Sequence, residues 1–307
     1  MGNNRNLHKA NLEKKDEYYT KMNNIEKELN YYTHYFKNKI VFCNCDDPEY
    51  SNFWKYFEIN FKKLKLKKLI ATHYEEVKTS YKLELILNKK ELSTIKSPLT
   101  QNGDFRSSEC IEILKEADIV VTNPPFSLFR EYIAQLMEYQ KDFIVIGSQN
   151  ALTYKELFPL FKKNKMWIGY NSGAQEFRVP DTYERNNIYI GVDGYKYAKF
   201  GNITWYTNLE ISKRHEIVPL YKKYNALEYP KYDDYDAINV SKISEIPYDY
   251  KGKMGVPVTI LEKFNPDQFE LIGIDRYLKD NPQYGRRFKI NGKEIYARIV
   301  IKNKKVK

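Results

Sequence analysis

The sequence predicts an α/β fold, with a mostly parallel sheet, an antiparallel hairpin edge and a smaller C-terminal region. Short apolar runs alternate with helical patterns over residues 39–163, which is typical of parallel strands joined by helices. Over residues 165–209 short strands are separated by Gly and Asn, which favours antiparallel hairpins. From about Arg214 onward Tyr, Pro, Asp and Lys dominate. We therefore expect one domain over 1–213 and a second over 214–307.

Each element is predicted from its own pattern. Helices are expected where apolar residues recur every three or four positions: Asn23–Phe36, the second half of 46–64, Glu109–Glu116, Ser127–Tyr139 and Tyr154–Lys163. Buried strands are expected at the short apolar or alternating runs 39–45, 67–74, 81–87, 118–123 and 142–148. Later strands are expected at KMWIGY, EFRV, NIYIGV, GNITWYTN, FELIGI and EIYARIVI. Because ligands bind at the carboxyl ends of parallel strands, residues 43–47, 72–75 and 122–126 are the places to look for a site.

Composition narrows the class of protein. The 307 residues are 42% hydrophobic and 30% charged, which predicts a soluble globular chain. The formal net charge of +11 favours an anionic partner, with nucleic acid first. The alternative is a general lysine bias, which the many Lys, Asn, Ile and Tyr residues would also fit.

Cysteine count and hydropathy predict the compartment. Three cysteines do not make a disulfide framework, and Cys43 and Cys45 have no second Cys or His pair near them that would complete a zinc site. No apolar run reaches the ~18 residues of a membrane span. The polar N-terminus lacks the apolar core of a signal peptide. We expect a cytoplasmic protein that holds no metal and contacts no membrane.

Residues 118–129 read DIVVTNPPFSLF and end a predicted core strand on two prolines. Proline has no backbone donor, so the strand should stop there. The side-chain carbonyl of Asn123 and the backbone carbonyl of Pro124 can accept both hydrogens of an exocyclic amine. Phe126 offers a ring face to a planar base that has left the duplex. The alternative is an ordinary strand end, since Asn-Pro and Pro-Pro are common in loops.

Asn-Pro-Pro-Phe after an apolar strand resembles the catalytic motif of amino-methyltransferases that use S-adenosylmethionine. The wider set of motifs is similar to the EcoRI-type adenine-specific DNA methyltransferases over nearly the whole chain. These motifs are KDEYYT (15–20), VFCNCDDPEYSNF (41–53), TNPPFSLFREY (122–132), FIVIGSQNAL (143–152), WIGYNSG (167–173), ITWYTNLE (203–210) and MGVPVTILEKFNPDQFELIG (254–273). The resemblance implies a Rossmann-like methyltransferase fold, with a C-terminal target-recognition region.

The resemblance also implies roles for individual residues. Asn123 and the carbonyl of Pro124 would bind the adenine amine, Pro125 would hold the loop, and Phe126 would stack on the flipped adenine. Residues implied to bind the cofactor are Tyr19, Thr20, Asn44, Asp46, Asp47, Glu75, Asp104, Phe105 and Asn123. Separately from the resemblance, the residues expected to meet DNA are Arg130, Trp205, Asn208, Arg286 and Arg287.

Several of these residues also have structural interpretations. Asp46-Asp47-Pro48 is also a pattern that caps a helix, and Glu75 is also typical of a solvated loop. Asp104 follows Asn102-Gly103, which is a turn signal. For Trp205 the interpretation as a buried residue of a hairpin is favoured over a contact with DNA. The chain departs from most methyltransferases in one respect, because the loop CNCDDPEYSNF after the first strand contains no glycine.

The motifs together predict a DNA adenine N6-methyltransferase that uses S-adenosylmethionine and releases S-adenosylhomocysteine. The substrate would be a short specific site in double-stranded DNA. The enzyme would belong to a restriction–modification system with a partner endonuclease, or would act as an orphan modification enzyme. We expect a monomer. The alternatives are an RNA or protein-glutamine amino-methyltransferase, or an inactive DNA-binding protein of the same fold.

Overall fold

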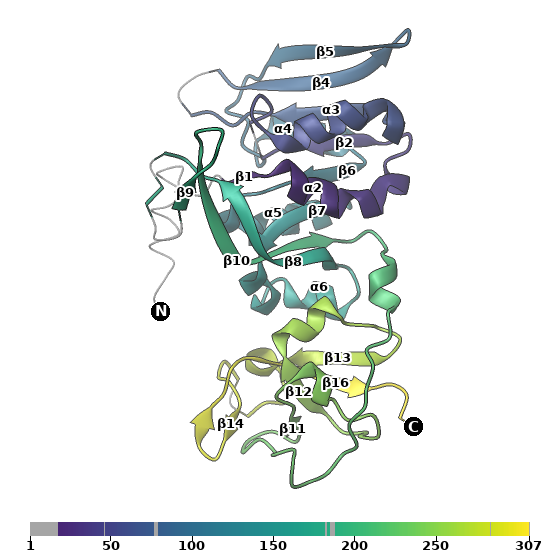
Figure 1. Ribbon diagram of the computed structural model, residues 1–307, viewed down its shortest axis with the longest axis vertical. Coiled ribbons are helices and arrows are strands. Elements are labelled where there is room, and N and C mark those ends of the chain that lie inside the picture. The colour runs from purple at the N-terminus through teal and green to yellow at the C-terminus, as the bar shows by residue number, and fades with distance from the viewer. Residues whose placement is uncertain are drawn as a thin grey trace. The chain divides into compact units, whose positions relative to one another are not determined.

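The computed structural model describes residues 18–45, 47–76, 79–181, 183–184, 188–282 and 284–306 (Figure 1). The chain divides into two compact units. The first contains the described residues up to Gln149 together with Gly169–Leu209, and the second contains Asn150–Ile168 together with the chain from Glu210 onward. The chain thus passes into the second unit twice, and residues 150–168 belong to that unit.

The first unit is organised around a ten-stranded mixed sheet (Figure 1). Along the sheet its strands are β1 (Tyr19–Thr20), β8 (Trp167–Arg178), β10 (Lys196–Thr207), β7 (Asp142–Ser148), β6 (Ile119–Thr122), β2 (Ile40–Cys43), β3 (Lys68–Thr72), β4 (Tyr81–Asn88) and β5 (Glu91–Pro98), and β9 (Ile188–Ile190) pairs with β10. This arrangement confirms the α/β class. The central strands β2, β3, β6 and β7 are almost entirely buried, as their continuous apolar runs predicted.

The parallel part of the sheet is smaller than the sequence predicted. Only the four strands β7-β6-β2-β3 are neighbours in parallel. Antiparallel pairs flank them on both sides, through β10 on β7 and through the β4–β5 hairpin on β3. The hairpin turns at Lys89 and Lys90, whose φ angles of 49° and 93° are those of a tight turn. β5 was not predicted because it is a mostly exposed edge strand without an apolar run.

The helices of the first unit bury part of their surface, except for the short η2, which has no buried residue. They are α2 (Met22–Leu29), the 3-10 segment η1 (Asn30–Tyr35), α3 (Asn52–Leu64), α4 (Ser108–Glu116), η2 (Phe126–Leu128) and α5 (Phe129–Glu138). In α3 the four-residue repeat of Phe53, Phe57 and Phe61 is buried, as predicted. The N-cap of α3 is Ser51, whose hydroxyl accepts from the Phe53 amide at 3.1 Å. The interpretation of Asp46-Asp47-Pro48 as this cap is therefore wrong.

A buried carboxylate fastens α2 to β8. Glu28 is fully buried and accepts hydrogen bonds from the Tyr32 hydroxyl at 2.9 Å, from the Tyr170 amide at 2.8 Å, and from the Asn171 backbone and side-chain amides at 2.8 Å and 2.7 Å. Burial raises the pKa of Glu28, and the four donors oppose that rise. Gly169 leaves the necessary room, because a Cβ there would lie 2.2 Å from Oε1 of Glu28.

Replacing Glu28 with Ala should destabilise the protein by about 3 kcal/mol, because four buried donors lose their acceptor. The measurement is the free energy of unfolding from a urea titration. Glu26→Ala is the matched control, since Glu26 is exposed on the same helix, and it should change stability by less than about 0.5 kcal/mol. Equal effects of the two substitutions would show that Glu28 does not hold α2 against β8.

The second unit contains a four-stranded sheet in the order β11-β12-β16-β13 and a separate two-stranded hairpin. Its strands are β11 (Ile238–Asn239), β12 (Met254–Pro257), β13 (Phe269–Ile274), β14 (Lys289–Ile290), β15 (Lys293–Glu294) and β16 (Arg298–Asn303). Its helical segments are α6 (Phe158–Lys162), η3 (Gln149–Thr153), η4 (Ser212–His215), η5 (Ile243–Glu245), η6 (Val258–Glu262) and η7 (Asp275–Tyr277), with η3 beginning one residue before the unit. The run FELIGI is β13, as predicted, whereas EIYARIVI spans the end of β15 and most of β16.

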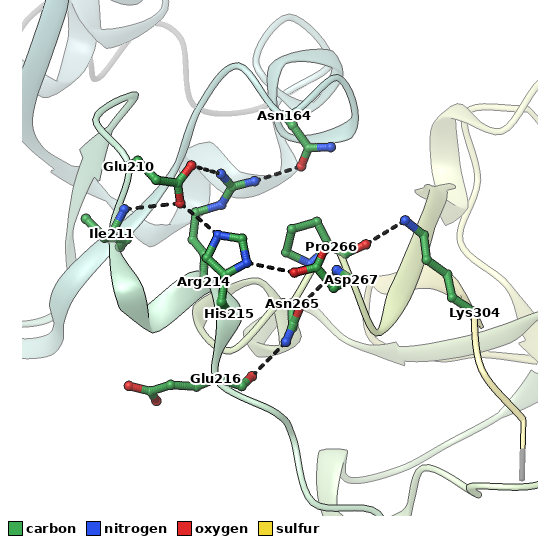
Figure 2. Close-up of polar contacts among 10 residues, drawn as sticks. All are labelled: Asn164, Glu210, Ile211, Arg214, His215, Glu216, Asn265, Pro266, Asp267 and Lys304. Carbon is green, nitrogen blue, oxygen red and sulfur yellow. Dashed lines mark hydrogen bonds and ion pairs between the residues drawn. The ribbon is translucent and has the colours of Figure 1, made fainter.

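A polar cluster joins three segments of the second unit (Figure 2). The Arg214 guanidinium donates to Glu210 at 2.8 Å and to Oδ1 of Asn164 at 2.9 Å, and it lies 3.8 Å from the ring centroid of Trp167. His215 lies between two carboxylates, 3.1 Å from Glu210 and 2.7 Å from Asp267. The cluster ties the chain that follows Leu209 to residues 164–167 and to the loop before β13.

His215 should make stability depend on pH. The hydrogen bond with Asp267 raises the pKa of His215 above its ordinary 6.5, against a smaller effect of burial. The contribution is therefore complete below pH 6.5 and is lost as pH rises through the raised pKa. Because the pair is exposed, we expect a loss of about 0.2–1 kcal/mol between pH 6 and pH 8.

Urea titrations at both pH values should show that His215→Gln removes this pH-dependent component and that Asp267→Asn reduces it, since Glu210 remains beside the imidazole. The double variant should remove no more than His215→Gln alone, because Asp267 acts here through His215. A pH dependence that survives His215→Gln would assign it to other groups.

Candidate active site

The order of the parallel strands places a topological switch point between β2 and β6. The chain proceeds from β2 to β3 on one side and from β6 to β7 on the other. At such a switch point the connections leave in opposite directions, and ligands bind beyond the carboxyl ends of the two strands. Asn44 directly follows β2, and Asn123 directly follows β6. The topology thus brings together two of the asparagines that the sequence singled out.

Asn123 is held by one end of its amide. Its side chain is only 6% exposed, and Nδ2 donates to the backbone carbonyl of Tyr18 at 2.6 Å. Oδ1 is buried and accepts no hydrogen bond. A buried acceptor without a donor is uncommon in native proteins and costs free energy. The fixed amide therefore presents an oxygen that is ready to accept from a ligand.

The residues after Asn123 form a loop with few backbone donors. Pro124 is buried, and none of the hydrogen bonds among the described residues uses its carbonyl oxygen. The carbonyl of Pro125 accepts from the Leu128 amide at 3.0 Å, which begins η2. Phe126 is half-buried, and its ring centroid lies 5.8 Å from that of Tyr18. The loop keeps an aromatic side chain beside the free acceptor of Asn123.

Tyr18 connects this loop to a group of aromatic side chains. Pairing of β1 with the end of β8 places Tyr18 next to Phe177. The ring of Tyr18 also packs against Phe200 at 4.7 Å and edge-on against Tyr183 at 5.9 Å. Sequence reasoning selected Tyr19 and Thr20 but missed Tyr18. The available signal was its place within KDEYYT, since Tyr18 acts through its backbone carbonyl and its ring.

Asn44 is oriented by a buried tyrosine. The hydroxyl of Tyr132 on α5 donates to Oδ1 of Asn44 at 2.5 Å. Burial raises the pKa of Tyr132 well above its ordinary value, so the hydroxyl stays protonated and remains a donor. Nδ2 of Asn44 is buried and has no acceptor. Sequence reasoning did not single out Tyr132, because an aromatic residue on the apolar face of a helix is normally part of the core.

Thr20 contributes a third buried polar atom without a partner. It is 1% exposed, its Oγ1 makes no hydrogen bond, and its carbonyl accepts from Nδ2 of Asn52 at 2.7 Å. Tyr19 is half-buried and lies under the guanidinium of Arg178 at 5.7 Å. Thr20, Asn44 and Asn123 come from the ends of three different strands, and each presents an unsatisfied polar atom.

Asp47 is engaged within the protein. Its Oδ1 accepts from the Glu49 amide at 3.0 Å and from the Tyr81 hydroxyl at 3.1 Å. Its Oδ2 lies 3.5 Å from Nε2 of His73. Its oxygens therefore already have partners in the turn before α3. The other candidate of this pair, Asp46, lies outside the described residues.

The loop 102–105 packs against the end of β3. Gly103 has a φ of 77°, and a Cβ there would lie 2.0 Å from the His73 carbonyl, so only glycine fits. The Glu75 amide donates to the Asn102 carbonyl at 2.9 Å. Glycine thus provides a close backbone approach here, whereas the loop after β2 has none.

Asp104 and Phe105 have different surroundings within that loop. The Asp104 carboxylate accepts from two nitrogens of the Arg106 guanidinium at 2.9 Å and 2.6 Å. Burial opposes ionisation of Asp104, but the bonds from Arg106 outweigh it and lower its pKa. Phe105 is buried, and its ring packs edge-on against Tyr132 at 5.0 Å. Phe105 therefore lies on the same tyrosine that orients Asn44.

The residues predicted to contact DNA differ in how exposed they are. Trp205 is fully buried in β10, with its ring edge-on to Phe53 at 6.0 Å. It presents no surface to DNA, so the prediction of a contact is wrong and the hairpin interpretation is right. Both ends of the Asn208 amide are used, by the Phe143 amide and the Lys141 carbonyl, each at 2.9 Å. Arg130, Arg286 and Arg287 are exposed.

We also searched the described residues for a second ligand pocket, a metal site and a membrane-spanning helix. A cavity of about 20 Å³ in the second unit is lined by apolar side chains such as Phe161 and Leu271 and by polar ones such as Asn164 and Arg214, and it has room for about one water molecule. No group of three His, Cys, Asp or Glu side chains suited to a metal occurs in the described part of the chain. Within the same residues, no helix is both long and apolar enough to cross a bilayer.

Comparison with known proteins places the chain in a family. Residues 6–304 match the family model described as adenine-specific methyltransferase EcoRI. The chain is 47% identical to the type II methyltransferase M.EcoRI of Escherichia coli, over 99% of this chain and 98% of the relative. It is 39% identical to the type II methyltransferase M.MpnI of Mycoplasma pneumoniae, over 97% and 98%. A third relative, M.MgeORF184P of Mycoplasma genitalium, is 38% identical over 98% and 99%.

No match was found among solved structures. The match to the family model and to the relatives extends over nearly the full length of the chain, and it includes both asparagines at the switch point. The chain therefore belongs to the EcoRI family of adenine-specific methyltransferases.

Proposed function

We propose that this enzyme transfers a methyl group from S-adenosylmethionine to the N6 amine of a flipped adenine in a short duplex DNA site. The single observation that carries the proposal is the buried, unsatisfied Oδ1 of Asn123, held in place by the Tyr18 carbonyl. Its position beyond β6, beside the half-buried ring of Phe126, suits a planar base with an exocyclic amine. The type II naming of the relatives supports a place in a restriction–modification system.

The protein groups act on the amine by position. Oδ1 of Asn123 and the carbonyl of Pro124 accept the two amine hydrogens, which fixes the nitrogen and increases its electron density. The ring of Phe126 stacks on the base and offsets part of the cost of unstacking it. The nitrogen forms its bond to the methyl carbon as the carbon–sulfur bond breaks, and it then loses one proton to water.

The residues beyond β1, β2 and β3 fit S-adenosylmethionine, which supplies the electrophilic methyl group when bound. Thr20 Oγ1 and Asn44 Nδ2 are two of the buried donors that lack partners among the described residues, and they suit the carboxylate of the methionine moiety. Glu75 and Phe105 suit the ribose and the adenine ring. The Asp104 carboxylate is shared with Arg106, so a bond from the cofactor's adenine amine would add to that pair.

The proposal also covers the roles of the two units, the partner molecules and the oligomeric state. Catalysis is assigned to the first unit, and target recognition to the second. The net charge of +11 supports double-stranded DNA as the partner. We propose that the enzyme acts as a cytoplasmic monomer and is functionally paired with a restriction endonuclease.

Expression in a methylation-deficient host, followed by sequencing that detects N6-methyladenine, should show methylation at one recurring DNA motif. Asn123→Ala should reduce methyl transfer by at least about 100-fold, because one of two acceptors for the amine is lost. Binding of duplex DNA should change only a few-fold, because the rest of the protein surface is unaltered.

Asn30→Ala is the control, since Asn30 is exposed and distant in sequence from the motif, and it should methylate normally. A folded wild-type protein that leaves genomic adenine unmodified would exclude the proposal. Attention would then turn to an RNA or protein substrate, or to a DNA-binding protein without activity.

Tyr132→Phe should weaken binding of S-adenosylhomocysteine about 5- to 10-fold, because Asn44 loses the donor that orients its amide. Isothermal titration calorimetry of the purified variant measures this. Tyr139→Phe removes a hydroxyl from the end of the same helix and should leave affinity unchanged. Equal affinities for wild type and Tyr132→Phe would show that Asn44 does not contact the cofactor.

A further inference from the structure

A short hairpin stands apart from the main sheet of the second unit. It consists of β14 and β15, with Lys289 opposite Glu294 and Ile290 opposite Lys293. Asn291 and Gly292 form its turn with φ angles of 50° and 75°. Two successive positive φ values produce the tight turn that matches the twist of a two-stranded ribbon. We call residues 286–294 the basic ribbon.

Isolated two-stranded hairpins are barely stable in water, yet this one is firmly attached. Phe288 is buried and stacks on Tyr232 at 4.4 Å and on Tyr235 at 4.9 Å. Ile290 and Ile295 pack against the same core cluster. The basic ribbon thus has one face fixed to the protein and the other directed away from it.

One aspartate fixes the tip. The Asp233 amide donates to the Lys289 carbonyl at 3.0 Å, and its carboxylate accepts from the amides of Asn291 and Gly292 at 2.9 Å and 2.7 Å. The carboxylate therefore serves the backbone of the turn. A tip held by three hydrogen bonds is suited to present side chains in fixed positions.

The basic ribbon carries a concentration of unpaired positive charge. Residues 286–294 contain four basic residues and one acidic residue, a net charge of +3 out of +11 for the whole chain. Arg286 and Arg287 are exposed, as is Lys293, and Lys289 is half-exposed. None of these four takes part in an ion pair among the described residues. Like charges held together without counterions favour an anionic partner.

We propose that the basic ribbon enters the major groove of duplex DNA and reads the target site. A two-stranded ribbon fits that groove, which is about 12 Å wide. Because Ile290 packs on the core, its partner Lys293 lies on the anchored face, while Lys289 and Glu294 lie on the opposite face. Lys289 and Glu294 contact base edges, as a donor and an acceptor, and Arg286 and Arg287 contact phosphates.

This inference rests on duplex DNA being the substrate, as proposed above. The probes are a duplex that contains the motif found by genome sequencing and one of equal length without it, each with a fluorescent label. If no motif is found, random-sequence duplex alone tests the phosphate contacts. Binding is measured by anisotropy with the full-length protein at several salt concentrations.

The double variant Arg286→Ala/Arg287→Ala should weaken binding to both duplexes. It should also lower the salt slope by about 1.8, since each phosphate contact contributes about 0.9. Lys223→Ala/Lys263→Ala removes two exposed charges elsewhere in the same unit and should leave the slope unchanged. An unchanged slope in the ribbon variant, or an equal fall in the control, would overturn the proposal.

Base reading is tested separately from phosphate contact. Lys289→Met and Glu294→Gln should each reduce the preference for the motif about tenfold or more, with little change in binding to the other duplex. Asp233→Ala should also reduce the preference, through the loosened tip, and Asp233→Asn should restore part of it. A preference that survives Lys289→Met and Glu294→Gln would exclude direct readout by this hairpin.

Failure of this inference is distinguishable from failure of the proposed function. Asn123→Ala should lose methyl transfer while retaining the salt slope and the preference for the motif. If wild type methylates DNA and the ribbon variants bind and discriminate normally, only the role of the basic ribbon is wrong. If the wild type binds neither duplex, both proposals fall together.

Discussion

The hydrogen bond from Asn123 to the Tyr18 carbonyl is the contact on which the arrangement of the site depends. It joins the loop after β6 to a segment 105 residues earlier in the chain. It also decides which end of the amide is free, because a carbonyl can only accept and therefore selects the nitrogen. The Tyr18 segment is in turn held by β1 on β8, and α2 follows it directly. Glu28 then fastens α2 to the same strand.

These contacts together hold Oδ1 of Asn123, the free acceptor, in a fixed position. β8 pairs with β1, receives the buried Glu28, and lies next to β10 in the sheet. Tyr132 has a similar role on the other side of the switch point, where it orients Asn44 and packs on Phe105. These buried hydrogen bonds of the first unit therefore hold the side-chain amides of Asn44 and Asn123 in place. The surrounding contacts also offset the free energy cost of leaving one polar atom of each amide unsatisfied.

The sequence predicted the parallel centre of the sheet well, because continuous apolar runs such as IVFC and IVVT mark strands buried on both faces. It predicted Asn44 and Asn123 through their positions at strand ends. It missed β5, whose exposed polar residues lack a period, and it missed Tyr18, which acts through its backbone. Trp205 is buried, as the interpretation of this segment as a buried hairpin expected. The role of Asp104 in binding a cofactor stays a prediction, and the sequence did not reveal that Arg106 holds its carboxylate.

The scarcity of backbone donors in the Asn-Pro-Pro loop has a consequence for discrimination between bases. Pro124 and Pro125 have no amide hydrogen, and Asn123 uses its side-chain donor on Tyr18. In its proposed role the loop therefore offers lone pairs alone. A keto oxygen of guanine or thymine placed there would meet two other oxygens without a hydrogen between them, which is repulsive. In that role the loop would reject keto bases by electrostatic repulsion before any methyl group is transferred.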